Sequence, residues 1–214
     1  EYAVFTLSSD IISWLTLLDL GISAGLNVQV AQQTGKPDQE KINILASTTF
    51  YSQLALVGII LLLGLGIAYI FPAFISVRPD LRSPSLFTIL LMVFGLGVSL
   101  GTRTFSVLLV AHQQVYMDNL IRFGLIAIRT TITVVLLIKG FGIISTALAN
   151  LAATIITCLL AVWRSYRLLP GLQIRRALFS GDVFKKTLGL GIWFSLGGLA
   201  GLVILNLDRL VTAK

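Results

Sequence analysis

The sequence predicts an all-α fold, namely a polytopic transmembrane helix bundle with six spans. Hydrophobic residues make up 56% of its 214 positions and charged residues only 12%, and the mean hydropathy is +0.94. A soluble domain carries about 25% charged residues. Six apolar stretches also reach the length of about 20 residues that one bilayer crossing requires. These observations indicate an integral membrane protein with short loops and no soluble catalytic domain.

The expected spans are apolar stretches separated by turn-forming residues. The first three exceed one crossing, so we expect them to tilt or to project into water. Gly and Pro signals at 35–38 and 78–80 separate the early spans, and the run Lys-Gly-Phe-Gly at 139–142 predicts a tight turn between two antiparallel helices. In chain order, the expected spans are 2–30, 45–77, 84–111, 119–138, 141–163 and 187–212.

The distribution of basic residues predicts the orientation in the membrane, because cytoplasmic ends collect Lys and Arg. One side carries Arg78, Arg82 and Lys139 alone. The segment 164–186, on the other side, is therefore expected in the cytoplasm, and the net charge of +7 is attributed to such loops rather than to nucleic-acid binding. The basic residues on the cytoplasmic side are Lys36, Lys41, Arg122, Arg164, Arg167, Arg175, Arg176, Lys185 and Lys186.

The only sizeable loop is the basic segment 164–186. We expect it to lie on the anionic inner leaflet as a linker, an interpretation favoured over a regulatory role. Ser180 is expected to cap a short amphipathic helix that leads into the last span. Because the chain begins at Glu1 and ends within an apolar stretch at Lys214, we also expect an internal fragment of a longer membrane protein.

Small residues recur four positions apart in three of the expected spans. The small-xxx-small spacing lets two helices approach closely. We therefore expect close helix packing at Gly21/Gly25, Gly97/Gly101 and Gly197/Gly201.

Two arginines lie within the fourth expected span. Asp118, Arg122, Arg129 and Thr133 share one helical face, because their spacings of four, seven and four fit a period of 3.6. An ion pair between Asp118 and Arg122 at the interface explains the first two. Arg129 lies about 10 Å of helix rise further in. A charge at that depth costs at least about 2.5 kcal/mol and normally faces a partner or a water-filled cavity.

A third arginine lies within the third expected span. Arg103 shares a face with Ser99 and Ser106. Two interpretations carry equal weight, since buried ionisable groups both form pairs and line transport paths. Arg103 either pairs with a buried carboxylate or lines a cavity that receives an anionic substrate.

Three aspartates within apolar stretches are candidates for cation coupling or for ion pairing. Asp10 and Asp19 lie on opposite faces of the first expected span, and Asp208 lies in the last. An ion pair with Arg103 or Arg129 is favoured for Asp10 and stays one of two possibilities for Asp19. The other possibility for these aspartates is cation coupling, in which the carboxylate takes up a proton or binds Na⁺ with nearby carbonyl groups.

The sequence lacks the signature of an enzyme. No zinc-protease, nucleophile-elbow or phosphate-loop motif is present. Cys158 and His112 are the only residues of their types, which excludes a disulfide framework, a Cys-based metal site and a His cluster. We expect no catalytic residues, no resident metal and no cofactor apart from H⁺ or Na⁺ as a coupling ion. Charges inside the spans instead favour a transporter over a membrane anchor.

Three stretches carry a family resemblance: EYAVF at 1–5 with LLDLG at 17–21, AHQQVYMDN at 111–119, and NLDRLV at 206–211. Together they resemble the Wzx-type polysaccharide flippases, which carry lipid-linked oligosaccharides. These flippases belong to the MATE/multidrug-oligosaccharidyl-lipid-polysaccharide exporter superfamily. The first stretch resembles the second family helix, the second resembles the turn between the fourth and fifth helices, and the third resembles the seventh helix. The order and spacing of these stretches agree with the orientation that the charges predict.

The resemblance implies a fragment of a two-lobed MATE-like transporter, whose lobes enclose a cavity that opens to alternate sides of the membrane. Residues 1–163 would then hold the N-terminal lobe without its first helix. Residues 164–186 would form the basic cytoplasmic inter-lobe linker, and 187–214 the first helix of the C-terminal lobe.

The resemblance also implies a function, the movement of a polyprenyl-pyrophosphate-linked oligosaccharide across the inner (cytoplasmic) membrane. That substrate would be an O-antigen or exopolysaccharide unit. By depth and helical face, Arg103, Arg122 and Arg129 are the candidates to bind its pyrophosphate, because the Arg fork bonds phosphate well. Expected partners are the lipid-linked oligosaccharide, membrane lipids, and a polysaccharide polymerase or other assembly protein.

Two alternatives remain open. A MATE-type cation-coupled multidrug antiporter would present an acidic, aromatic-lined cavity, whereas the deep charges in this sequence are mostly basic. A membrane scaffold would need fully paired charges and no central cavity.

Overall fold

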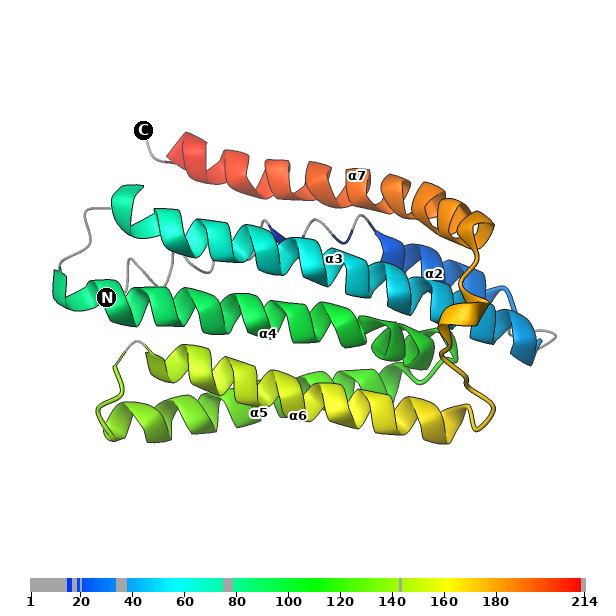
Figure 1. Ribbon diagram of the computed structural model, residues 1–214, viewed down its shortest axis with the longest axis horizontal. Coiled ribbons are helices and arrows are strands. Elements are labelled where there is room, and N and C mark those ends of the chain that lie inside the picture. Colours follow the sequence, from blue (N-terminus) through cyan, green and yellow to red (C-terminus); the bar gives the residue numbers. More distant parts are fainter. Residues whose placement is uncertain are drawn as a thin grey trace.

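The protein is a bundle of long helices (Figure 1). The computed structural model describes residues 15–16, 19, 21–33, 38–74, 79–142 and 144–212; the side chains of 70–74, 79–85, 198–199 and 201–212 lie outside the description. The described residues contain no strand. Their helices are α2 (Ile22–Ala31), α3 (Gln39–Phe74), α4 (Pro79–Ala111), α5 (Val115–Ile138), α6 (Ile144–Leu168) and α7 (Gly181–Thr212), with the 3-10 helix η2 (Arg176–Leu178).

The predicted all-helical membrane class is confirmed. Within the described residues, four helices are long and apolar enough to cross a membrane: Gln39–Tyr69, Leu86–Ala111, Val115–Ile138 and Ile144–Leu168. They correspond to the second to fifth expected spans. The last expected span lies within α7, and the first is described only from residue 15 onward, with α2 as its helical part.

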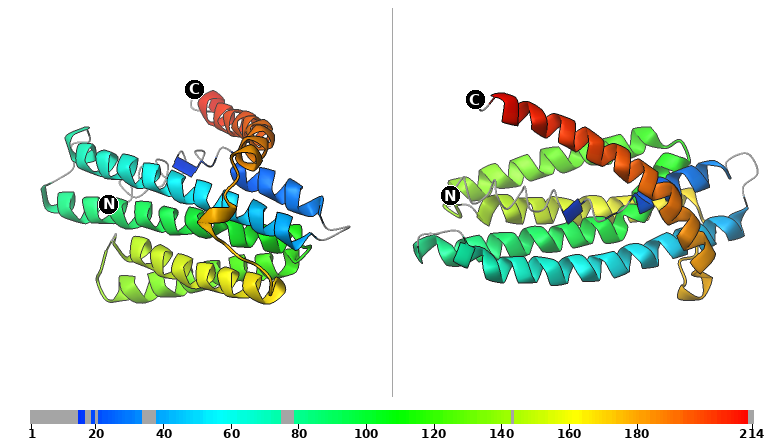
Figure 2. Two further views of the ribbon diagram at one scale, coloured as in Figure 1. Left: turned by 45° about the vertical axis from the view of Figure 1, so that its right-hand side comes forward. Right: turned by 90° about the horizontal axis from the view of Figure 1, so that it is seen from above.

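The helices run up and down along one axis (Figure 1). α4 packs between α3 and α6, α5 packs chiefly on α6, and α2 contacts both α4 and α7. We call the end of the bundle that carries the connection 169–180 the linker end, and the opposite end the far end. α7 leaves the linker end beside α2, and its C-terminal part lies away from the other helices (Figure 2).

The turn between α5 and α6 lies at the far end, where the sequence predicts it. Gly140 and Gly142 have φ values of +82° and +56°. Glycine adopts this left-handed region without the steric cost that a Cβ imposes. The chain therefore reverses within a few residues, and α5 and α6 form the expected antiparallel hairpin.

The first third of α3 carries polar side chains, and these bind the backbone of the linker, the connection 169–180. Asn43 donates from Nδ2 to the carbonyl oxygen of Gly171 (3.1 Å) and accepts at Oδ1 from the amide of Gln173 (3.0 Å). Ser47 accepts from the amide of Arg175 (3.2 Å). α3 therefore begins six residues before the expected span, and the linker lies against the bundle.

The linker is also shorter than expected. α6 continues to Leu168 and α7 begins at Gly181, so only 169–180 lies between them. Leu169 and Leu172 are buried in the apolar core at the linker end. Ser180 precedes a single continuous α7, not a separate short helix, and its hydroxyl lies 3.5 Å from the amide of Val183.

α2 and α7 approach each other through glycines, as predicted for Gly21/Gly25. A Cβ at Gly21 would overlap the carbonyl group of Gly191, and one at Gly25 would overlap the carbonyl oxygen of Thr187. Beside them, Gln29 donates from Nε2 to the hydroxyl of Thr187 (2.6 Å). The two backbones can lie this close only because no side chain separates them.

The other two glycine pairs differ from the first. A Cβ at Gly97 would meet Val57 and Leu61 of α3 at 3.3 and 3.5 Å, a tight side-chain contact. A Cβ at Gly197 would have no neighbour within 4 Å among the described residues, and the Gly201 side of that pair lies outside the described side chains.

Candidate functional site

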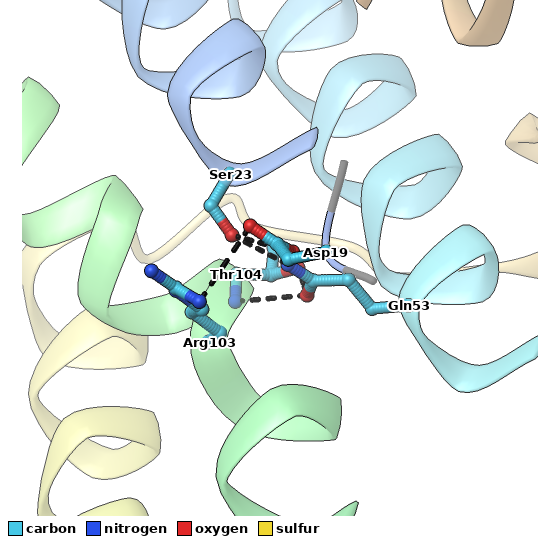
Figure 3. A network of polar contacts seen from close by, with 5 residues as sticks. All are labelled: Asp19, Ser23, Gln53, Arg103 and Thr104. Atoms are coloured by element: carbon cyan, nitrogen blue, oxygen red, sulfur yellow. Dashed lines mark hydrogen bonds and ion pairs between the residues drawn. The ribbon is translucent and has the colours of Figure 1, made fainter. Parts of the chain in front are cut away.

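The central polar feature is an ion pair between two helical segments. Arg103 of α4 lies with Nη1 3.5 Å from Oδ2 of Asp19, and the side chains are 45% and 9% exposed, respectively. Of the two partners that the sequence left open for Asp19, the structure brings Arg103 to it. Figure 3 shows the pair together with the residues that support it.

A chain of hydrogen bonds joins this pair to α3. Ser23 donates to Oδ1 of Asp19 (3.2 Å), and Gln53 donates from Nε2 to the hydroxyl of Ser23 (3.0 Å). The Gln53 carbonyl oxygen accepts from both the hydroxyl (2.6 Å) and the amide (3.2 Å) of Thr104. The network thus joins α2, α3 and α4 in the bundle interior (Figure 3).

Burial explains why this network matters for the fold. Gln53 and Thr104 are 1% and 0% exposed. A buried polar group left without a partner costs about 1–3 kcal/mol, whereas this network satisfies both ends of the Gln53 amide. It therefore fixes the relative position of three helices and, with them, the guanidinium group of Arg103.

Arg103 also lines a cavity of about 200 Å³ between α4, α5 and α6. Arg103 thus both pairs with a buried carboxylate and lines a cavity. Most of the lining polar groups are hydroxyl or charged groups, and no aromatic residue in the described part of the chain contributes to the lining. The polar lining consists of Thr16, Ser99, Thr102, Arg103, Ser106, Asp118, Arg122, Thr154, Thr157 and Cys158.

A second ion pair lies on the α5 wall of this cavity. Arg122 contacts Oδ2 of Asp118 through Nε at 2.7 Å; the Arg side chain is 70% exposed and the Asp side chain 6%. The two residues are one helical turn apart, as their spacing predicts. Asp118 lies in the first turn of α5, where a negative charge is favourable to the helix dipole.

Arg129 does not join these two arginines. It is exposed on α5, two turns beyond Arg122, and it is not among the residues that line the cavity. Its carbonyl oxygen accepts from the hydroxyl of Thr133 (2.8 Å). Within the described part of the chain its guanidinium group has no carboxylate partner.

The remaining candidate residues lie outside the description. Asp10 precedes the described residues, and Asp208 lies in α7 at a position whose side chain is not described. Among the described residues, no three His, Cys, Asp or Glu side chains are grouped so as to hold a metal ion. Of the three candidate aspartates, Asp19 is the one whose side chain is described, and it pairs with Arg103.

Sequence reasoning missed two residues of the site. Gln53 was not singled out, although an amide at the start of a long apolar run is itself a signal. Cys158 was treated as an ordinary residue of an apolar helix; its sulfur accepts from the Thr102 hydroxyl at 2.8 Å on the cavity wall. These contacts join helices distant in sequence, so spacing alone does not reveal them.

Comparisons with known proteins bear on the fold. No protein-family model and no curated protein sequence matches the chain. Two solved structures do match, each with a TM-score of 0.77, 17% sequence identity, and coverage of 95% of this chain and 46% of the other. One is a multidrug resistance MATE family transporter of the MOP superfamily in an outward-facing conformation. The other is a MOP superfamily transporter from Pyrococcus furiosus, whose reversed pocket polarity suggested a different function. The chain therefore has the fold of part of a MOP superfamily transporter and spans less than half the length of these neighbours.

Proposed function

We propose that the chain forms one lobe, and the start of the second, of a Wzx-type flippase. The full protein would carry a polyprenyl-pyrophosphate-linked oligosaccharide, such as an O-antigen or exopolysaccharide unit, across the cytoplasmic membrane by alternating access. The linker end would lie in the cytoplasm, as the distribution of Lys and Arg indicates. The observation that carries the proposal is the cavity lined by Arg103 and Arg122.

The state of these two guanidinium groups supports an anionic ligand. Each is bonded to one carboxylate oxygen through one nitrogen, within the described part of the chain. A guanidinium group has five N–H donors, so each can donate hydrogen bonds to phosphate oxygens while it remains paired with its Asp. Hydrogen bonds between Arg and phosphate are charge-assisted and can be bidentate.

The size of the cavity indicates which part of the substrate it would receive. Its volume of about 200 Å³ is below the roughly 300 Å³ at which pockets for drug-sized ligands begin. A pyrophosphate head group suits this space better than a glycan does. The sugar would then lie in the wider path between the two lobes.

The alternative is a MATE-type multidrug antiporter, and one of the two structural neighbours is described as a multidrug resistance transporter. A cavity for cationic, aromatic drugs requires aromatic surfaces and surplus negative charge. Among the described residues, this lining contains no aromatic side chain, and Asp118 is balanced by Arg122. These features favour the anionic substrate.

A non-transporting scaffold is the other alternative. Such a protein would have its charges paired, as Arg103 and Arg122 are, but it would have no use for a polar cavity. The cavity between α4, α5 and α6 therefore favours transport.

Substrate protection in the full-length protein tests the proposal. Ser106 lines the cavity and Lys139 is exposed in the α5–α6 turn. In a Cys158→Ser background, a membrane-impermeant maleimide should label both Ser106→Cys and Lys139→Cys. Lipid-linked oligosaccharide should slow labelling at position 106 and leave position 139 unchanged. Equal labelling with and without that substrate, or protection by a cationic drug alone, would refute the flippase.

A further inference from the structure

A second and larger hollow lies on another part of the bundle. It has a volume of about 850 Å³ and is formed by α2, α3, the segment from η2 to Phe179, and α7. No described residue contributes both to this groove and to the cavity of Arg103. Its volume lies within the range of roughly 300–1,000 Å³ that small-molecule sites occupy.

The walls of the groove are apolar and open. On α3, Leu54 and Ile59 are 49% and 51% exposed, with Ala55 exposed between them. The opposite wall contains Phe179 and Phe184, whose rings lie 6.5 Å apart. A surface of this kind in a membrane-spanning helix is expected to face hydrocarbon chains.

The sequence of α3 places the groove at one depth of the bilayer. Residues 54–74 form an uncharged apolar run of about one crossing, whereas residues 39–53 are rich in polar side chains. Tyr51 lies at this boundary, and Tyr is typical of the membrane interface. From Tyr51 to Ile59 the helix rises about 12 Å, close to the ~15 Å of a single hydrocarbon leaflet.

Among the described residues that line the groove, one is charged, and it lies at the interfacial end. Arg176 of η2 lines the groove and is exposed. Polar side chains of α3 hold the chain on both sides of η2: Ser47 accepts from the amide of Arg175 (3.2 Å) and Thr48 from the amide of Ser180 (3.1 Å). Among the described residues, Arg176 has no carboxylate partner.

We propose that this groove binds a phospholipid with an anionic head group, taken from the leaflet at the linker end. The phosphate lies on the guanidinium group of Arg176, and one acyl chain lies along α3 from Tyr51 to Ile59. The single arginine matches the single charge of a phosphodiester, and its fork bonds phosphate oxygens. The apolar walls match the chain in length and chemistry. The groove is a separate site from the cavity of Arg103, because the two share no described lining residue.

Native mass spectrometry of the full-length protein tests the head-group contact. The protein is released from nanodiscs of palmitoyl-oleoyl phosphatidylglycerol and phosphatidylcholine, and retained lipids are counted. The wild-type protein should retain phosphatidylglycerol in preference to phosphatidylcholine. Arg176→Gln should lower this retention about tenfold, since it removes a charge-assisted bond. The matched control is Arg175→Gln, at an adjacent exposed residue outside the groove, which should behave as wild type.

A second pair of variants tests the acyl-chain contact. Ala55→Trp fills the groove from an exposed position, whereas Leu159→Trp places the same ring on an exposed part of α6. Only Ala55→Trp should reduce lipid retention. Equal retention in Arg176→Gln and Arg175→Gln, or in both Trp variants, would overturn the proposal. So would retention of no lipid by wild type, the result expected if another part of the full-length protein fills the groove.

Discussion

The arginines of two Arg–Asp pairs line one cavity, but the two pairs differ in the parts of the structure that they connect. Arg103 and Asp19 come from different helical segments and belong to a buried network, although their closest atoms are 3.5 Å apart. Arg122 and Asp118 are 2.7 Å apart on a single helix. The shorter contact is thus the local one. We therefore expect the pair between two helical segments to contribute more to the stability of the bundle than the shorter pair within one helix.

The largest expected effect comes from Arg103→Gln. It leaves Asp19, 9% exposed, without its cation. Breaking a fully buried pair costs about 3–5 kcal/mol. Because Arg103 is half exposed, we expect about 2–3 kcal/mol of unfolding free energy to be lost, measured by SDS titration of the full-length protein in mixed micelles. The double variant Arg103→Gln/Asp19→Asn should recover part of this loss; strictly additive losses would show that the pair is not coupled.

The next largest loss of stability is expected from Gly25→Ala, on the side of α2 that contacts α7. The added Cβ would overlap the carbonyl oxygen of Thr187, and overpacking of this kind costs about 1–3 kcal/mol. Gly197→Ala is the matched control, because nothing described lies within 4 Å of its Cβ position. There the better helix propensity of Ala should leave stability unchanged or raise it by up to about 1 kcal/mol. Similar losses in both variants would argue against a specific α2–α7 contact.

Gln53→Leu tests whether the network, and not the ion pair alone, positions Arg103. Thr104 would lose the acceptor for its buried hydroxyl, at a cost of about 1–2 kcal/mol. The reactivity of a thiol at position 106 should also change if Arg103 shifts. Unchanged stability and unchanged thiol reactivity would mean that the amide is dispensable.

Arg122→Gln should have the smallest effect on stability. Arg122 is 70% exposed, so solvent screens its pair with Asp118, although Asp118 itself is only 6% exposed. Pairs one turn apart on a helix contribute about 0.3–0.5 kcal/mol, and the dipole of α5 continues to favour the charge of Asp118 after the substitution. We expect less than about 1 kcal/mol in the same SDS titration. A loss equal to that of Arg103→Gln would remove the distinction between the two pairs.

The long helices could be predicted from the sequence because membrane spans are specified by apolar length. The ends at Ala111 and Ile138 match the expected ones, and the Gly140/Gly142 turn is confirmed. The start of α3 was misjudged, since its first third is polar. Those polar residues bind the linker backbone, a contact that hydropathy does not reveal.

The sequence could predict the candidate site only where the residues in contact are close together in the chain. Asp118 and Arg122 follow from helical spacing. Gln53, by contrast, bonds to residues 30 and 51 positions away in the chain, and nothing in its immediate sequence specifies those partners. Arg129 shares a helical face with Arg122 yet lies beyond the cavity, because the cavity extends along only the first part of α5.

Binding of the polyprenyl-pyrophosphate-linked oligosaccharide to full-length Arg122→Gln, compared with Arg129→Gln, tests the central claim most directly. If the cavity holds the pyrophosphate, Arg122→Gln should weaken binding about tenfold, the effect of one charge-assisted bond, while the protein stays folded. Arg129→Gln, outside the cavity, should bind as wild type does. Wild-type affinity in Arg122→Gln, or an equal loss in both variants, would contradict a pyrophosphate site at this cavity.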